Sequence, residues 1–282
     1  MAGSYRPQVF ECTGPPGATA NTSPATPPAP AAPAPGYLVS AGQLESARTP
    51  RTRLLLVSSP AGPTGAVHPP DEVAEIGRWA SDTGLRVITD ETYEHLVYGG
   101  ATAPSMPALL PELQPRCVAV NGVGTSCGMS GWGWAGCWAR RTWSRPPPPC
   151  RPSPAPPWRR SSSGPPPRPL AGDQSGVAAM RTAFDRRRQI VVGMLRQVPG
   201  LACPELQGAC SVYPSVTALL GRPIAGRTAA TSAELAELLL TGARVAVVPG
   251  EAFGTPGYLR LSYAVEDAEL VEGLHRLLGS AG

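Results

Sequence analysis

The chain has 282 residues, of which 42% are hydrophobic, and this is enough for one large domain or two modest ones with a real core. No run of about 18 apolar residues predicts a membrane span, and the amino terminus lacks the basic-then-apolar pattern of a signal peptide, so a cytoplasmic location is expected. The formal net charge is only +4, and seven scattered cysteines with three histidines include no CxxC pair, so the composition predicts neither a disulfide framework nor a metal site.

Residues 1–36 are rich in Pro, Ala, Gly, Ser and Thr and show almost no apolar periodicity. Such a composition cannot bury enough apolar surface to offset the entropy of ordering, so a disordered tail is predicted. Order is expected from Tyr37, and residues 37–136 are predicted to form part of a large domain. A short helix and a connection are expected within residues 40–53.

A strand, a helix and a strand follow in the sequence. Residues 54–57 form a continuous apolar run bounded by turn residues, which is typical of a buried strand. Residues 71–83 come after a Gly/Pro loop and place Val73 and Ile76 on one helical face. A β-branched run then ends in Asp90. The short connections and the preferred right-handed crossover predict that the two strands are parallel.

Loops with polar groups follow three predicted strands. The third strand, residues 117–120, leads into the loop 121–125. The other two loops are 58–65 and the one that contains Asp90 and Tyr93. The carboxyl ends of parallel strands share one edge of the sheet, and ligands bind there in open α/β folds. The side chains of Asp90 and Tyr93 are therefore predicted to face one pocket. Taken alone, an Asp at a strand end is more often a turn residue, and a Tyr more often packs its ring.

Residues 137–169 break this pattern because they are dense in Pro and Arg. Proline removes a backbone donor and pushes the preceding residue out of the helical region, so a disordered tract is predicted. Seven arginines and no acid occur in it, and the basic excess therefore belongs to this segment alone. Contact with nucleic acid or with an aromatic-lined groove is the alternative, but no nucleic-acid-binding motif accompanies the tract, and no such partner is expected.

Residues 170–282 contain three predicted helices. Hydrophobic residues at helical spacing predict the first helix through 177–195, with the arginine run 186–188 on its solvated side. The sequence Thr-Ser-Ala-Glu at 231–234 is a capping box that opens the second helix. The third helix carries an apolar stripe of leucines through 270–277.

Three strands are predicted between these helices. They cover residues 210–216, 244–248 and 258–263. Mixed strands and helices after the Pro/Arg tract indicate a second, smaller α/β domain.

Composition also limits the chemistry of the chain. All 24 basic residues are arginine, and no lysine occurs anywhere in the sequence. A lysine amine is the side chain that forms imines with carbonyl compounds, in addition to acting as a nucleophile or a base. The chain has no such group.

Four stretches carry a resemblance to a known family when they are taken together. They are LLLVSSPAGPTGAVHPPDEVAEIGRWASDTGLRVITDETYEHLVYGG (54–100), NGV (121–123), GMSGWGW (128–134) and VVPGEAFGTPGYLRLSYA (247–264). In this order they resemble the class I and II aminotransferases of the aspartate aminotransferase fold, which use pyridoxal phosphate. The resemblance covers about 37–136 and 170–282. It implies an α/β protein of fold type I, with a partial, mostly parallel large domain that binds the cofactor and a smaller C-terminal α/β domain.

The resemblance also implies roles for three residues and the class of partner. Asp90 matches the carboxylate that keeps the ring nitrogen of pyridoxal phosphate protonated, and Tyr93 matches the phenol that hydrogen-bonds the 3-oxygen. Arg260 matches the arginine that grips the α-carboxylate of the substrate through its planar fork. The implied substrates are an amino acid and a 2-oxo acid, and the family's usual assembly is a homodimer.

Other positions depart from the family pattern. The family's Schiff-base lysine falls at Thr125, so no catalytic residue is intact there. The arginine that grips the cofactor phosphate falls at Gly133, and the asparagine of the usual Asn-Pro-Thr-Gly loop falls at Gly62. An aromatic residue near the substrate is replaced around Cys210. The amino-terminal part of the large domain has no counterpart.

These departures leave three hypotheses. The first is a transaminase by descent, with negligible turnover because the covalent catalyst and its proton shuttle are lost. The second is a non-catalytic product, either a truncated pseudoenzyme with weak or no cofactor binding or the result of a reading-frame disturbance. Such a disturbance is hypothesised for residues 137–169, and whether residues 1–36 also reflect one is left open. The third is another doubly wound nucleotide-binding domain, which lacks the GxGxxG element.

Overall fold

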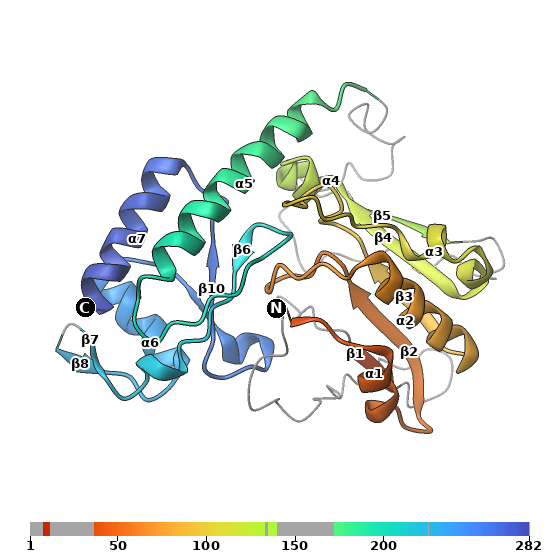
Figure 1. The fold of residues 1–282 in the computed structure, drawn as a ribbon, viewed down its shortest axis with the longest axis horizontal. Coiled ribbons are helices and arrows are strands. Elements are labelled where there is room, and N and C mark those ends of the chain that lie inside the picture. The colour runs from red at the N-terminus through yellow and green to blue at the C-terminus, as the bar shows by residue number, and fades with distance from the viewer. Residues whose placement is uncertain (1–7, 12–36, 133–134, 140–171, 225, 282) are drawn as a thin grey trace.

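A five-stranded sheet organises the first half of the chain in the computed structural model, which describes residues 8–11, 37–132, 135–139, 172–224 and 226–281 (Figure 1). Its strands lie side by side in sequence order: β1 (Gln8–Glu11), β2 (Thr52–Ser58), β3 (Arg86–Asp90), β4 (Cys117–Gly122) and β5 (Ala135–Ala139). The three central strands are parallel, and the two outer ones are antiparallel to their neighbours. The predicted parallel strand pair is confirmed.

Helices cover one face of this sheet. In α2 (Pro70–Asp82), Pro70 occupies the first turn, where its missing N–H costs nothing, and Asp71 and Glu72 complement the helix dipole. The buried side of α2 packs on Leu55 and Val87 of the sheet. A short helix, α1 (Ala41–Ala47), begins at a capping box and lies beside α2, and α3 (Met106–Leu109) completes the layer.

The other face of the sheet is less covered. Alternation along parallel strands puts Leu56, Ile88 and Val120 on this face, and all three are half-buried. Ser58 and Asp90 are paired in register at its edge. The candidate cofactor residue Asp90 therefore points to the face opposite α2.

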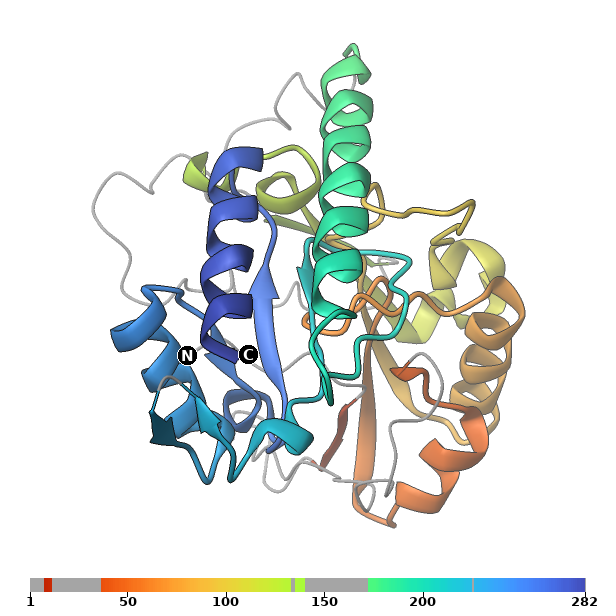
Figure 2. The ribbon, with the colours of Figure 1, turned by 60° about the vertical axis from the view of Figure 1, so that its left-hand side comes forward.

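The second half of the chain forms a smaller α/β unit. Its elements are α5 (Ser175–Leu195), β6 (Ser211–Val212), β7 (Pro223–Ile224), β8 (Arg227–Thr228), α6 (Ser232–Leu238), β9 (Val248–Pro249), β10 (Leu259–Ser262) and α7 (Asp267–Ala281). Strand β10 lies between β6 and β9, antiparallel to both, and β7 pairs with β8. Helices α5 and α7 lie side by side (Figure 2). Leu195, Leu235 and Leu274 are among the buried residues of its core.

Short helical turns connect these elements. The α-helical turn α4 (Val123–Ser126) follows β4. Turns of 3₁₀-helix cover Pro111–Arg116, Ser130–Trp132, Thr217–Leu219 and Gly250–Phe253, and a π-helical turn covers Leu239–Ala243.

The strand predictions for the smaller unit are only partly right. The strand expected at 244–248 is wrong except at Val248, because the π-helical turn runs to Ala243 and Arg244 then takes the left-handed conformation with φ of 55°. The strand expected at 210–216 shrinks to Ser211–Val212, and Pro214 soon follows without an N–H to donate. The strand at 258–263 is confirmed as β10.

Two segments predicted to be disordered contain strands. Gln8–Glu11, within residues 1–36, pairs with β2, whose outer edge offers unpaired backbone groups to an extended segment. Residues 137–139, at the start of the Pro/Arg tract, belong to β5 because they continue its pairing with β4 before the prolines begin. The rest of both disorder predictions, residues 12–36 and 140–169, lies outside the described residues, as do residues 1–7.

The arginine run of α5 is not uniformly solvated. Arg186 has a side chain that is 58% exposed, as predicted, but Arg187 is 19% exposed and Arg188 only 8%. The prediction of an exposed charged face is therefore wrong for Arg188. It lies three and four residues before the buried Val191 and Val192, so the helical period places it on the packed side of α5.

Candidate functional site

Asp90 ends β3 at the rim of the sheet and is 7% exposed. Its Oδ1 accepts hydrogen bonds from the backbone N–H of Thr92 at 3.1 Å and from the Thr92 hydroxyl at 2.8 Å. Its Oδ2 accepts none from the part of the chain that the structure describes. A buried carboxylate thus retains one oxygen for a ligand that donates a hydrogen bond.

Tyr93 follows three residues later, in the loop after β3. Its ring packs over Gly62, where an added Cβ would lie 3.5 Å from the ring. Its hydroxyl hydrogen-bonds the thiol of Cys210, which belongs to the smaller unit. The phenol therefore spans the two halves of the chain.

Arg260 is half-buried on β10, and its charge acts on the same thiol. Burial raises the pKa of Cys210, while the charge of Arg260 and the hydrogen bond from Tyr93 oppose that rise. The structure thus brings Tyr93 and Arg260 together around Cys210, a residue that the sequence singled out only as a departure from the family pattern.

Backbone contacts hold the two units together at this point. The N–H of Gly208 donates to the carbonyl of Gly65 at 2.9 Å, and the N–H of Ala209 donates to the carbonyl of Leu96 at 3.0 Å. The buried hydroxyl of Ser211 donates to the carbonyl of Pro63 at 3.1 Å. The segment that carries Cys210 is therefore fixed against two of the three loops predicted to share the rim.

Thr125 lies in α4, after the carboxyl end of β4, and is half-buried. Its neighbour Ser126 donates a hydrogen bond to the carbonyl of Thr92 at 2.7 Å, and Thr92 in turn holds Asp90. The third loop therefore lies beside the loop that follows β3. Gly133, the position predicted to replace a phosphate-gripping arginine, lies outside the described residues.

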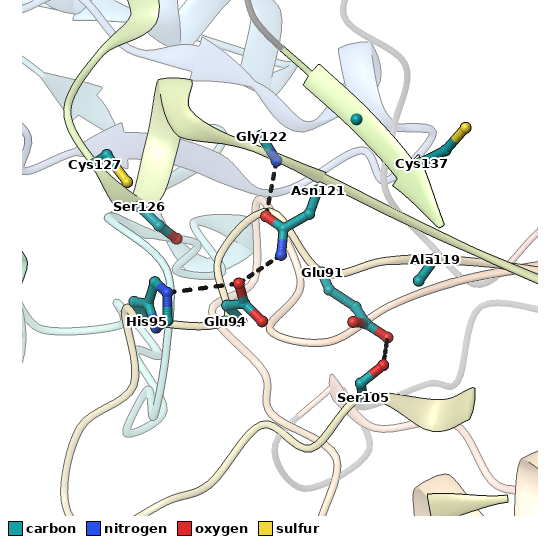
Figure 3. Close-up of a pocket in the computed structure, with 11 residues that line it drawn as sticks. Glu91, Glu94, His95, Ser105, Ala119, Asn121, Gly122, Ser126, Cys127 and Cys137 are labelled. Atoms are coloured by element: carbon teal, nitrogen blue, oxygen red, sulfur yellow. Dashed lines mark hydrogen bonds and ion pairs between the residues drawn. The ribbon is translucent and has the colours of Figure 1, made fainter. Parts of the chain in front are cut away.

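A cavity of about 350 Å³ opens at the same rim, and Asp90, Tyr93, Thr125, Cys210 and Arg260 are not among the residues that line it. Its polar side chains are Glu91, Glu94, His95, Ser105, Asn121 and Ser126 (Figure 3). Ala119 and Asn121 alternate with Val120, the partner of Asp90 in β4, so the cavity is on the α2 side of the sheet. Strand alternation at Asp90 and Glu91 is the sequence signal that could have indicated this second face.

Two glutamates dominate the chemistry of this cavity. Burial raises the pKa of Glu91, and its hydrogen bonds from Ser105, Thr89 and the N–H of Met106 partly oppose that rise. Glu94 accepts a hydrogen bond of 2.6 Å from Asn121, and His95 lies 3.6 Å from the same oxygen. The cavity therefore presents acceptors and negative charge.

The described residues lack two kinds of feature. They contain no group of three or more His, Cys, Asp and Glu side chains arranged to hold a metal ion. None of their helices is both long enough and apolar enough to cross a lipid bilayer.

Comparison with known proteins places the fold. The sequence profile described as aminotransferase class I and II matches residues 20–146 and 155–277. An aspartate aminotransferase of Streptomyces avermitilis is 48% identical over 258 residues, which cover 86% of this chain and 59% of that protein. An aspartate aminotransferase of Geobacillus stearothermophilus is 34% identical over 252 residues, covering 86% and 61%. The crystal structure of the aspartate aminotransferase from Rhizobium meliloti aligns with a TM-score of 0.74 at 29% identity, covering 87% of this chain and 62% of that one.

These matches confirm the predicted fold class. The matched residues extend further along the chain than the expected 37–136 and, at the start of the second segment, 170–282. The profile match begins at residue 20 and resumes at 155, so it reaches into both segments that the sequence predicts to be disordered. The chain spans about 60% of the length of the relatives it matches.

Proposed function

The chain belongs to the class I and II aminotransferase family, and from that premise we propose that it descends from a transaminase and no longer turns over substrate. The family uses pyridoxal phosphate to move an amino group between an amino acid and a 2-oxo acid, and we propose the same ligands for this chain. The observation that carries the loss of turnover is the absence of lysine from all 282 residues. No side-chain amine is available to hold the cofactor or to move a proton.

The residues at the rim fit the cofactor in part. Asp90 is buried and has one oxygen without a hydrogen bond from the described residues, which suits the protonated nitrogen of a pyridine ring. Tyr93 adds a phenol in the following loop. When bound, pyridoxal phosphate would supply an electron-withdrawing ring. At the lysine position, the hydroxyl of Thr125 can hydrogen-bond but cannot replace an amine.

Arg260 supports the substrate class. Arg260 is half-buried and its charge acts on Cys210, the thiol that Tyr93 hydrogen-bonds. The planar fork of donors on a guanidinium can bind a carboxylate in a bidentate manner. This suits the α-carboxylate that amino acids and 2-oxo acids share. The two relatives compared above are named for aspartate, and a homodimer would be the usual assembly of the family. Both the substrate and the dimer are part of this proposal.

We expect the purified chain, supplied with pyridoxal phosphate, aspartate and a 2-oxo acid, to show no transamination above background. The reason is that losing a covalent catalyst lowers the rate by several powers of ten. A coupled assay for the new 2-oxo acid measures this, with the S. avermitilis relative as the positive control. Turnover that follows this chain through purification and needs the cofactor would show that the proposal is wrong.

Cofactor binding separates this proposal from the alternative of a pseudoenzyme or frame-disturbed product that does not bind it. We expect Asp90→Asn to weaken binding of pyridoxal phosphate by at least about tenfold, because a charged partner for the ring nitrogen is lost. Titration followed by cofactor absorbance measures the dissociation constants. Asp82→Asn, at an exposed site at the end of α2, is the matched control and should bind like the unmodified chain. No measurable binding by the unmodified chain would favour the alternative.

A further inference from the structure

We propose that the cavity beside Glu91 and Glu94 is a second binding site, separate from the candidate cofactor residues, and that it takes a small organic ligand carrying a primary ammonium group. Its volume of about 350 Å³ is in the range of small-molecule sites. It opens on the face of the sheet opposite Asp90, so it does not overlap the pocket proposed above.

Glu91 supplies the main evidence for a ligand. The residue is only 6% exposed, and its Oε1 receives three hydrogen bonds, from Ser105 at 3.0 Å, Thr89 at 3.2 Å and the N–H of Met106 at 3.3 Å. Its Oε2 receives none from the described residues, although the side chain lines the cavity (Figure 3). This oxygen is not among the buried side-chain atoms that lack a partner, so it is accessible from the cavity and a ligand there can donate to it.

Glu94 also lines the cavity and also accepts hydrogen bonds from the described residues through one carboxylate oxygen only. Its Oε1 accepts the hydrogen bond from Asn121 and faces His95, and its Oε2 has no donor among the described residues. Among the described residues that line the cavity there is no arginine, and His95 is the one that can become cationic. The two carboxylates therefore make the cavity complementary to a cation.

The hydrogen-bond pattern favours an ammonium over other cations. A guanidinium binds best when both oxygens of one carboxylate are free for its planar fork, but each glutamate here has only one oxygen free. A compact ammonium has three donors and can take single oxygens from two residues. A divalent metal is disfavoured because the described residues include no set of ligands arranged for one. The small residues Ala119, Gly122 and Gly136 leave space for a short alkyl chain.

Isothermal titration of the full chain with butylamine tests the proposal, with butanol as the neutral control of the same size. We expect saturable binding of butylamine and at least about tenfold weaker binding of butanol. Glu91→Gln and Glu94→Gln should each weaken butylamine binding at least about tenfold. Glu112→Gln removes an exposed acid outside the cavity and should leave binding unchanged.

Several outcomes would overturn the proposal. These are absence of butylamine binding, equal binding of butanol, tighter binding of butylguanidine or Mg²⁺, and binding that neither cavity variant changes. Thermal unfolding of each variant is measured in parallel, because Glu91 holds the start of α3 through Ser105 and Met106. If Glu91→Gln fails to fold, the more exposed Glu94→Gln decides the result alone.

Discussion

Replacing Thr125 with lysine is expected to let this chain form an imine with pyridoxal phosphate, which added borohydride reduces to a stable secondary amine, and the unmodified chain cannot form such an adduct at any side chain. Thr125 lies in α4, directly after the carboxyl end of β4. Its helical turn is tied through Ser126 to the loop that holds Asp90. A lysine there would place an amine beside the acid and phenol proposed to orient the cofactor ring. Imine formation needs little more than a nearby, partly deprotonated amine.

The composition of the chain makes the labelling result easy to interpret. Because the chain has no lysine, the introduced side chain competes only with the α-amino group at the chain start. Mass spectrometry of the reduced protein measures the added cofactor mass, and peptide mapping locates it. Thr182→Lys is the matched control, since Thr182 lies on the exposed side of α5. We expect at least about tenfold more adduct at position 125 than at position 182 at low cofactor concentration.

Equal labelling at positions 125 and 182 would mean that no pocket directs the cofactor to α4. In that case the assignment of Thr125 to the lysine position is wrong, whatever the family. Labelling at 125 that is lost when Asp90→Asn is added would connect the two residues through one bound cofactor. The double variant therefore tests the proposed site as a unit.

The parallel part of the fold was predictable because its signals are local and agree. The segment around α2 combines an apolar strand, an amphipathic helix and a second strand with short connections, and only one handedness is common for that arrangement. The smaller unit was harder, since β6 and β9 have two residues each and depend on pairing with β10. Such strands carry almost no periodicity of their own.

The candidate site was also predictable only in part. The resemblance placed Asp90, Tyr93 and Arg260 in the sequence, but it could not show that the last two both act on the thiol of Cys210. Strand alternation could have indicated the face on which Glu91 lies, but not the free acceptors of the cavity, because these depend on which oxygen of each glutamate is already hydrogen-bonded. That information exists only in the packed structure.

Arg188 illustrates how a charge run can conceal a structural residue. Its guanidinium donates to Asp185 at 2.9 Å and to the carbonyl of Leu206 at 2.8 Å. It also lies 5.4 Å from the centre of the Tyr98 ring, which belongs to the larger unit. The Tyr98 hydroxyl donates to the carbonyl of Ala209, so the arginine supports the segment that carries Cys210 against the rim loops.

We therefore expect Arg188→Met to lower the free energy of unfolding by about 3 kcal/mol, because it removes a buried guanidinium from its pair with the partly exposed Asp185 and leaves the carbonyl of Leu206 without that donor. Arg186→Met is the matched control two residues away, where the pair with Asp267 is exposed to solvent and is expected to contribute much less to stability. Urea unfolding followed by circular dichroism measures both. A loss at Arg188 no larger than the loss at Arg186 would show that the buried guanidinium does not hold the two units together. The charge run would then behave as one solvated face, as its sequence suggests.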